Sequence, residues 1–324
     1  MRALRQHTHH GPQDMRLTTD MPVPSPGPGE VLVRVTAAGV NFRDVTRAYG
    51  TSPDAPEPPY TAGFEAAGEV VAVGDGVTGP RPGDHVVGVA DGAFAEYVVL
   101  PALSAMPVPP GWTGPQALGL CVNWPTALAA LTTLGGLHKG QAVLIHAAAG
   151  ATGQAAIRIA RHLGATVIAA ASPGKHGTVE ALGADHVLDS RDPGIAAAVR
   201  VLTGGHGADL VLESSGGDTF AASLDAARRV TGRVVVLGTA GGEAAVTNLD
   251  LVYRHQIQLI GLNIGVLAQA APQVFGALMG ELSALIAAGA VPPADPTRYD
   301  LADGPKALAD LASRATVGKL ALLP

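Results

Sequence analysis

The chain has 324 residues, of which 47% are hydrophobic and 15% charged, which is enough apolar material for the cores of about two domains and excludes a disordered chain. Its formal net charge of −6, without a long run of either sign, argues against a nucleic-acid-binding surface. The one cysteine, Cys121, excludes an intramolecular disulfide, and the lack of a signal-peptide core and of a charge-free apolar stretch of about 18 residues predicts a soluble, cytoplasmic protein that does not enter a membrane.

The first 120 residues predict a β-rich domain. Short segments in which β-branched residues alternate with others are separated by clusters of proline and glycine, which is typical of strands joined by turns. The predicted strands are residues 30–37, 68–73, 84–89 and 95–100. We therefore expect an antiparallel, partly closed β domain over residues 1–120.

Beyond residue 120 the pattern changes to strands that alternate with helices, after a helical stretch over about residues 116–134. Apolar runs predict buried strands near residues 141–147, 166–171, 186–188, 209–213, 233–237 and 258–262. Such runs, each followed by a helix, indicate a parallel sheet covered on both faces and fit a doubly wound dinucleotide-binding domain over residues 121–264. We expect the remainder, about 265–324 with a helix over Val274–Ala288, to return to the first domain.

A glycine-containing loop stands between the first of these strands and the next helix. The sequence Ala147–Gly153 (AAAGATG) lies in the context that the dinucleotide fingerprint requires. Gly150 would let the backbone approach a pyrophosphate, Gly153 would let the helix pack closely on the strand, and the helix N-terminus would offer N–H groups to phosphate. Because Ala148 replaces the first glycine of the fingerprint, an ordinary strand–helix turn is the alternative. The residues predicted to bind a cofactor here are Ala149, Gly150, Ala151, Thr152 and Gly153.

The end of the second strand predicts which nicotinamide cofactor binds. An NAD site places Asp or Glu there, about 20 residues after the glycine loop. This chain instead has Ser172 and Lys175, a hydroxyl and an ammonium that attract an extra phosphate, and no carboxylate that would repel it. We therefore expect NADPH; the alternative is that Ser172 and Lys175 belong to a solvated loop.

Several motifs together resemble one family. They are Gly39–Asp44 (GVNFRD), Gly63–Gly68 (GFEAAG), Pro82–Val86 (PGDHV), Val143–Asp189 and Ser313–Leu320 (SRATVGKL). Along essentially its whole length the chain resembles zinc-free medium-chain dehydrogenases/reductases, most of all quinone oxidoreductases and the enoyl reductase domains of polyketide and fatty acid synthases. The resemblance implies an α/β fold in which a GroES-like, partly closed β-barrel catalytic domain is joined to a doubly wound Rossmann cofactor domain.

The resemblance also implies further cofactor contacts. The 2′-phosphate would be held by Lys175 and by Ser190, which stands where quinone oxidoreductases often have Tyr. In some members an arginine like Arg314 completes this group, and a surface salt bridge is the alternative for this residue. Gly238 and Asn263 fall where the nicotinamide and its ribose would lie.

We expect no metal, because the residues that bind zinc in relatives are replaced. Zinc-dependent relatives carry Cys at the position of Asn41, a His–Glu pair at that of Phe64–Glu65, and four closely spaced cysteines near residues 90–110, where this chain has none. Catalytic zinc needs three protein ligands and an open position, and the remaining histidines do not restore such a set at these positions.

Without a metal to polarise an alcohol, hydride transfer to a conjugated acceptor is the easier reaction, because charge spreads onto a carbonyl oxygen. We therefore predict an NADPH-dependent reductase of a quinone or an α,β-unsaturated carbonyl. Asn41 is the candidate for orienting the nicotinamide or the substrate carbonyl, with capping of a turn as the alternative. Thr126 matches a threonine that lies against the nicotinamide in relatives, or is a helix residue without a catalytic share. Tyr49 either substitutes for a family tyrosine as proton donor or is simply packed.

Other functions stay open at this point. They are a zinc-free alcohol or carbonyl oxidoreductase, an enoyl-thioester reductase that acts in trans on a carrier protein, and a non-catalytic NADPH-binding protein. The apolar strands near residues 233–237 and 258–262 would leave a sheet edge exposed, so we expect a homodimer that pairs edge to edge.

Overall fold

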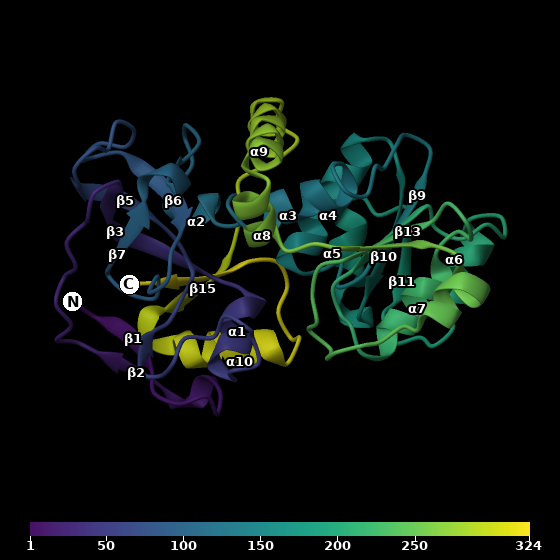
Figure 1. Cartoon of the computed structure of the whole chain (residues 1–324), viewed down its shortest axis with the longest axis horizontal. Coiled ribbons are helices and arrows are strands. Elements are labelled where there is room, and N and C mark those ends of the chain that lie inside the picture. The colour runs from purple at the N-terminus through teal and green to yellow at the C-terminus, as the bar shows by residue number, and fades with distance from the viewer. The chain divides into compact units, whose positions relative to one another are not determined.

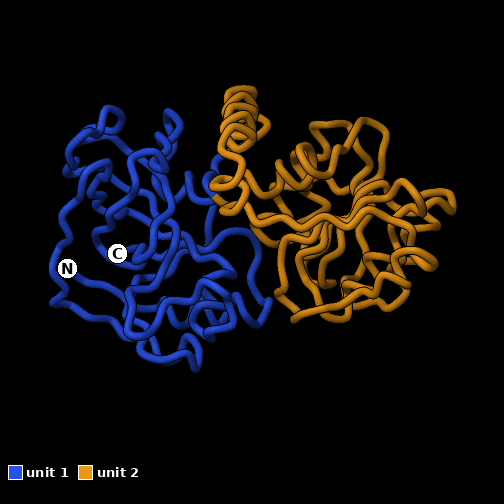
Figure 2. Tube along the Cα trace, viewed as in Figure 1, with its two compact units in different colours: residues 1–121, 293–324 blue, residues 122–292 orange.

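A computed structural model describes all 324 residues, and in it the chain forms two compact units (Figure 2). Unit 1 consists of Met1–Cys121 together with Pro293–Pro324, and unit 2 of Val122–Pro292. The two ends of the chain therefore build one unit, and a continuous middle segment builds the other. No helix reaches the combination of length and apolar character that crossing a membrane requires.

The return to unit 1 begins at Pro293, whereas the sequence places it at about residue 265. The intervening residues form α8 (Ile264–Ala270) and α9 (Pro272–Ala287). Both helices contact α3 (Asn123–Leu131), the first helix of unit 2, and α9 buries apolar side chains such as Leu278 and Leu282. This packing groups them with the middle segment.

Two β-sheets build unit 1 (Figure 1). The larger has the strand order β15-β16-β3-β5-β6-β8 with β7 on β3, and its pairs are antiparallel except β15 with β16; the smaller has the order β2-β1-β4. The strands are β1 Ala3–Gln6, β2 Met15–Thr18, β3 Glu30–Val40, β4 Tyr60–Thr61, β5 Glu65–Val73, β6 His85–Val89, β7 Tyr97–Pro101, β8 Met106–Pro107, β15 Thr297–Asp300 and β16 Leu320–Leu323. The predicted β-rich first domain is confirmed, and β3 extends three residues beyond its predicted end because Ala38 and Val40 are also buried.

Short helices complete unit 1. They are α1 Phe42–Ala48, α2 Gly114–Ala117 and α10 Gly304–Ala312, with 3-10 turns over Pro12–Asp14, Ala102–Ser104 and Leu301–Asp303. Helix α1 begins where β3 ends, because Asn41 is its N-cap and forms a capping box with Asp44. It packs against α10, so the core joins the start and the end of the chain.

Unit 2 is a six-stranded parallel sheet with the order β11-β10-β9-β12-β13-β14 and helices around it (Figure 1). The strands are β9 Ala142–Ile145, β10 Thr166–Ala171, β11 His186–Asp189, β12 Leu210–Glu213, β13 Arg233–Val236 and β14 Gln258–Gly261. The remaining helices are α4 Ala151–His162, α5 His176–Ala181, α6 Ile195–Leu202 and α7 Asp218–Ala226, with a 3-10 turn over Pro173–Lys175 and a π-helix over Asp250–His255. The predicted doubly wound fold is confirmed.

The strand order of unit 2 reverses between β9 and β12. From β9 the chain builds outward through β10 to β11, then crosses back and continues from β12 through β13 to β14. In sheets of this kind ligands bind in the crevice outside the carboxyl ends of the strands, at the point of reversal. The loops that follow β9, β10, β12 and β13 therefore border the expected nucleotide site.

The predicted helix over residues 116–134 is interrupted. The structure has α2 and α3 there, separated by a turn. Leu118 is extended and Gly119 has a φ of 93°, a left-handed conformation that glycine adopts without steric cost. The N–H of Gly119 donates to the Glu65 carboxylate at 2.6 Å. A long-range hydrogen bond thus takes the backbone group that a continuous helix would use.

Candidate cofactor and catalytic sites

The loop after β9 brings the predicted phosphate-binding residues together. Ala147 has a φ of 47°, and α4 begins at Ala151 with Gly150 as its N-cap. A Cβ on Gly153 would lie 2.5 Å from the carbonyl oxygen of Ala147 and 2.6 Å from the Cα of Ala148. Backbone therefore packs on backbone here, and a larger residue at 153 would force the loop away from the helix.

The first turn of α4 is left open to an anion. Gly150 has no side chain with which to cap the helix, so no side-chain cap satisfies the N–H groups at its start. The Thr152 hydroxyl accepts a hydrogen bond from Asn123 Nδ2 at 3.0 Å, and Gln154 Nε2 donates to the carbonyl of Ala149 at 3.0 Å. These contacts fix the loop from both sides, as a site that cradles a phosphate requires.

Two basic side chains, Lys175 and Arg191, follow the ends of β10 and β11. Ser172 and Lys175 bound the turn after β10, and the N–H of Ser190 donates to the carbonyl of Ala171 at 3.0 Å, which holds the ends of the two strands together. Burial, and next the charge of Arg191, lower the pKa of the Lys175 ammonium. Two basic side chains that influence each other in this way favour an anion beside them.

Arg191 is a residue that the sequence reasoning missed. It follows Ser190 directly, and its side chain is exposed. The signal that could have found it is a basic residue just after each of two neighbouring parallel strands, since the carboxyl ends of such strands meet at one edge of the sheet.

The other predicted cofactor residues belong to other elements. A Cβ on Gly238 would lie 2.7 Å from the carbonyl oxygen of Ser214, so the loops after β12 and β13 are in contact. Asn263 caps α8, where its side-chain oxygen accepts from the N–H groups of Gly265 (2.9 Å) and Val266 (3.2 Å). Arg314 belongs to unit 1, in the exposed turn after α10.

A buried charged cluster in unit 1 surrounds Asn41. Lys319 Nζ lies 2.6 Å from Glu65 Oε2 and 2.7 Å from Asn41 Oδ1, and Asn41 Nδ2 donates to Glu65 Oε2 and to the carbonyl of Gly39, both at 3.1 Å. All three side chains are at least 93% buried. Both amide hydrogens of Asn41 are therefore used inside the protein, and the capping role foreseen as its alternative is present as well.

Glu65 is the centre of this cluster. Its carboxylate accepts from Lys319, Asn41 and the N–H of Gly119. A Cβ on Gly39 would lie 2.2 Å from Glu65 Oε2, so the carboxylate needs a glycine beside it. The ammonium and the two further donors offset the cost of burying this carboxylate.

Asp44 is the second buried carboxyl group of unit 1. Its Oδ2 accepts from the N–H of Asn41 at 2.8 Å, while Oδ1 is buried without a hydrogen-bond partner. Burial raises the pKa of Asp44 to about 7, although the nearby Lys319 and Arg47 charges act in the opposite direction. This carboxyl group therefore changes its charge near neutral pH.

Phe64, which stands where zinc-dependent relatives carry a histidine ligand, has its ring covered by two arginines. The Arg43 guanidinium lies 4.0 Å from the centroid of the Phe64 ring, and that of Arg47 lies 5.8 Å from it. Arg47 is itself held by Asp91 (2.5 Å) and Asp54 (2.7 Å). Phe64 thus packs under cations instead of presenting a ligand.

Nowhere in the chain do three His, Cys, Asp or Glu side chains gather in a way that could hold a metal ion. Cys121 Sγ lies 3.4 Å from the carbonyl oxygen of Val87, and burial raises the pKa of this thiol, so the thiolate that zinc requires is disfavoured. The donor set of a catalytic zinc site does not fit these residues.

The remaining candidate catalytic residues have ordinary local surroundings. The Thr126 hydroxyl donates to the carbonyl of Val122 at 2.6 Å, within the first turn of α3. Tyr49 is the C-cap of α1 and is 46% exposed. Thr126 belongs to unit 2, and Tyr49 to unit 1.

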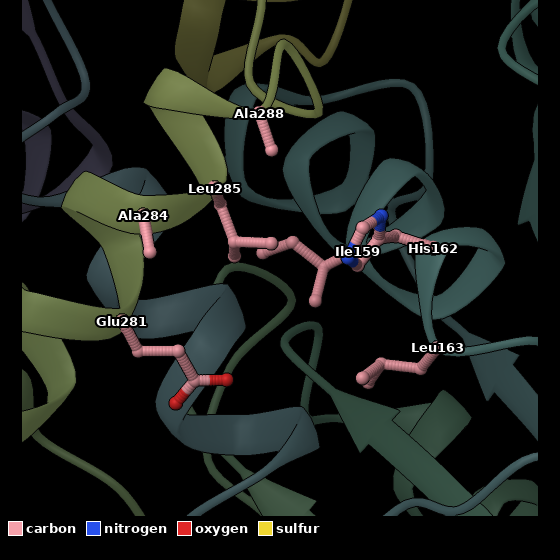
Figure 3. A pocket seen from close by; sticks show the side chains of 7 residues that line it. All are labelled: Ile159, His162, Leu163, Glu281, Ala284, Leu285 and Ala288. Atoms are coloured by element: carbon pink, nitrogen blue, oxygen red, sulfur yellow. The ribbon is translucent and has the colours of Figure 1, made fainter.

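A hollow of 320 Å³ lies between α4 and α9 in unit 2 (Figure 3). Its walls are mostly apolar, with His162 on one helix and Glu281 on the other. The lining residues are Ile159, His162, Leu163, Glu281, Ala284, Leu285 and Ala288. None of the predicted cofactor or catalytic residues lines it, so it is not the candidate site.

Two families match parts of the chain. Residues 27–110 match the alcohol dehydrogenase GroES-like domain, and residues 151–282 match the family described as zinc-binding dehydrogenase. The crystal structure of Escherichia coli quinone oxidoreductase complexed with NADPH is 30% identical, with a TM-score of 0.92 and coverage of 100% of both chains. The CurK enoyl reductase is 28% identical, with a TM-score of 0.91 and coverage of 99% of this chain and 98% of that chain.

Curated relatives include much longer proteins. Erythronolide synthase EryA2 of Saccharopolyspora erythraea is 39% identical over 296 residues, which are 91% of this chain and 8% of the synthase. The chain thus spans only a small part of the length of the curated relatives it matches.

Proposed function

The chain belongs to the medium-chain dehydrogenase/reductase superfamily, and from this premise we propose that it is an NADPH-dependent reductase that passes hydride to a quinone or an α,β-unsaturated carbonyl without a metal. The observation that carries the proposal is the pair Lys175 and Arg191 beyond the ends of β10 and β11, where an NAD-specific sheet has a carboxylate.

The residues present fit this cofactor. Gly150 and the open start of α4 would receive the pyrophosphate, and Gly153 keeps that loop tight. Ser172, Lys175, Ser190 and Arg191 would hold the 2′-phosphate. Gly238, Asn263 and Arg314 stay proposed contacts.

NADPH, when bound, supplies the hydride. The protein positions the cofactor and the acceptor and excludes water. A conjugated acceptor suits such a metal-free site because the negative charge that develops spreads onto an oxygen atom. Asn41 would orient a carbonyl only by giving up its contact with Glu65 or Gly39, so we propose that it acts mainly by fixing the start of α1. Thr126 stays a candidate contact for the nicotinamide, and Tyr49 stays a candidate proton donor. Water is the proton source if neither side chain donates the proton.

We also propose a homodimer that forms through β14. This strand is the edge of the sheet of unit 2, and Leu259 on it is 37% exposed. Leu249, Val252 and Tyr253, which precede it, are apolar and exposed as well. An unprotected edge with apolar neighbours favours pairing with a second copy. Sedimentation of a monomer at working concentration would remove this proposal.

Stopped-flow oxidation of NADPH against a panel of quinones, enones and enoyl thioesters tests the function. We expect turnover with at least one class, no change on adding a chelator, and NADPH bound more tightly than NADH. Turnover of a simple aldehyde alone would favour a carbonyl oxidoreductase instead. Tight NADPH binding without turnover of any acceptor would favour a non-catalytic binding protein, and equal affinity for NADH would contradict the 2′-phosphate site.

A further inference from the structure

A second buried carboxylate lies in unit 2, beneath the loops that follow β12 and β13. Glu213, the last residue of β12, is 0% exposed. Its Oε1 accepts from the N–H groups of Ser215 (2.7 Å) and Gly216 (2.8 Å), and its Oε2 accepts from the Ser223 hydroxyl. Every one of these partners is a donor, so the arrangement suits an ionised carboxylate.

The hydrogen-bond partners in this network assign its protons. Ser223 has a single O–H, which the carboxylate of Glu213 attracts more strongly than the carbonyl of Thr219 at 3.0 Å. The Ser223 oxygen must then accept from His146 Nε2, 3.0 Å away. Burial lowers the pKa of the His146 imidazole, so the ring is neutral with its hydrogen on Nε2. A directed chain runs from His146 through Ser223 to Glu213.

This chain of hydrogen bonds spans the point where the strand order reverses. His146 follows β9 directly, Glu213 ends β12, and Ser223 lies on α7, which follows β12. The N–H of His146 donates to the carbonyl of Leu212 at 3.1 Å, which locks the two strand ends together. No residue of the phosphate site beyond β10 takes part in it.

The carboxylate shapes two loops at once. It fixes the turn over residues 214–217, where Gly216 has a φ of 69° and a Cβ would lie 2.2 Å from the Gly242 oxygen. The N–H of Gly217 donates to that same oxygen at 3.1 Å, and the N–H of Ala240 donates to the Ser214 oxygen at 3.4 Å. The loop after β12 therefore holds the loop after β13, residues 238–242, in place.

We propose that Glu213, fastened by Ser223 and His146, is a positioning residue that shapes these two loops to receive the nicotinamide half of the dinucleotide. A dinucleotide in this fold lies across the reversal point, so with its adenosine 2′-phosphate at β10 and β11 its other half lies over β12 and β13. The inference rests on the proposed function, since it needs a nicotinamide dinucleotide to act on.

The test compares NADPH with adenosine 2′,5′-bisphosphate, which carries the 2′-phosphate but no nicotinamide. Calorimetry on Glu213→Gln should show NADPH bound about tenfold more weakly, because hydrogen bonds to a charged group are lost, with the bisphosphate affinity within about twofold of wild type. In turnover assays the KM for NADPH should rise more than kcat falls. Glu281→Gln, an exposed side chain of α9 far in sequence from both loops, is the matched control and should leave the affinity for both ligands unchanged.

Ser223→Ala covers the case in which Glu213→Gln does not fold. It keeps the carboxylate and should weaken NADPH binding alone, by about threefold. Unchanged NADPH affinity in a folded variant overturns the inference, and so does an equal loss for both ligands, which would indicate general damage to unit 2. Failure of the wild-type protein to bind NADPH defeats the proposed function itself, and this inference with it.

Discussion

Replacement of Asp44 by Asn should make the stability of this protein less dependent on pH. In the unfolded chain the Asp44 carboxyl has an ordinary pKa of 3.8, and in the fold burial raises the pKa to about 7. Between these values the native state keeps a proton that the unfolded state has lost, so the free energy of unfolding falls as pH rises. Above about pH 7 the cost of ionising Asp44 inside the fold is about 4 kcal/mol.

The measurable part of this effect lies around neutral pH. From about pH 5.5 to about pH 8.5 the wild-type protein should lose about 2 kcal/mol of unfolding free energy relative to Asp44→Asn. The amide can still accept the Asn41 N–H through its own oxygen, so the cap of α1 is preserved. Urea denaturation at a series of pH values, followed by circular dichroism, gives the difference directly.

Asp20→Asn is the matched control, because Asp20 lies on an exposed N-terminal segment. The free energy of unfolding of this variant should change with pH as that of the wild type does over the same range. A constant difference between wild type and Asp44→Asn at every pH would refute the reasoning, since it would mean that the buried carboxyl does not exchange a proton in this range. A wild-type protein that lost unfolding free energy relative to Asp44→Asn as the pH fell would contradict the predicted direction.

Three further substitutions test the sites directly. Lys175→Ala should weaken NADPH binding about tenfold or more without changing NADH binding, and the difference in NADPH affinity between wild type and variant should narrow as salt is added. Calorimetry at two salt concentrations measures both effects, and equal losses of affinity for the two nucleotides would count against the 2′-phosphate site. Gly153→Val should abolish NADPH binding, since backbone atoms lie within 2.7 Å of its Cβ; a binding isotherm like that of wild type would contradict the loop geometry. Glu65→Gln should destabilise unit 1 by about 3–5 kcal/mol because Lys319 stays buried without its counter-charge; Lys319→Met in the same background should recover part of this, and an additive loss would show that the pair is not coupled.

The sequence predicts the strands of unit 2 well for a physical reason. A strand buried on both faces has to be apolar throughout, as in Val167–Ala171, and such runs stand out in any sequence. The glycine loop is predictable on similar grounds, because the close backbone contact at Gly153 tolerates no side chain.

The buried clusters were beyond prediction from the sequence because their members are distant in it. Lys319 and Asn41 are 278 positions apart and meet only because β16 pairs with β3. Likewise His146 and Ser223 come together across the reversal of the sheet, 77 positions apart. Nothing local marks such residues, since a polar residue among apolar ones looks the same whether it faces solvent or a partner.

The placement of α8 and α9 shows a related limit. Their apolar faces could have covered either unit, and only the packing on α3 decides between them. The turn at Gly119, which splits the predicted helix, depends in the same way on a distant acceptor, the carboxylate of Glu65.

The interleaving of β16 between β3 and β15 has a consequence for biosynthesis. A ribosome synthesises all strands of unit 2, the last of which ends at Gly261, well before residues 320–323 exist, so unit 2 can complete its sheet while unit 1 still lacks an interior strand. Until then Glu65 lacks its ammonium partner, because Lys319 directly precedes β16. Unit 1 is thus the part of the protein that stays incomplete longest during synthesis.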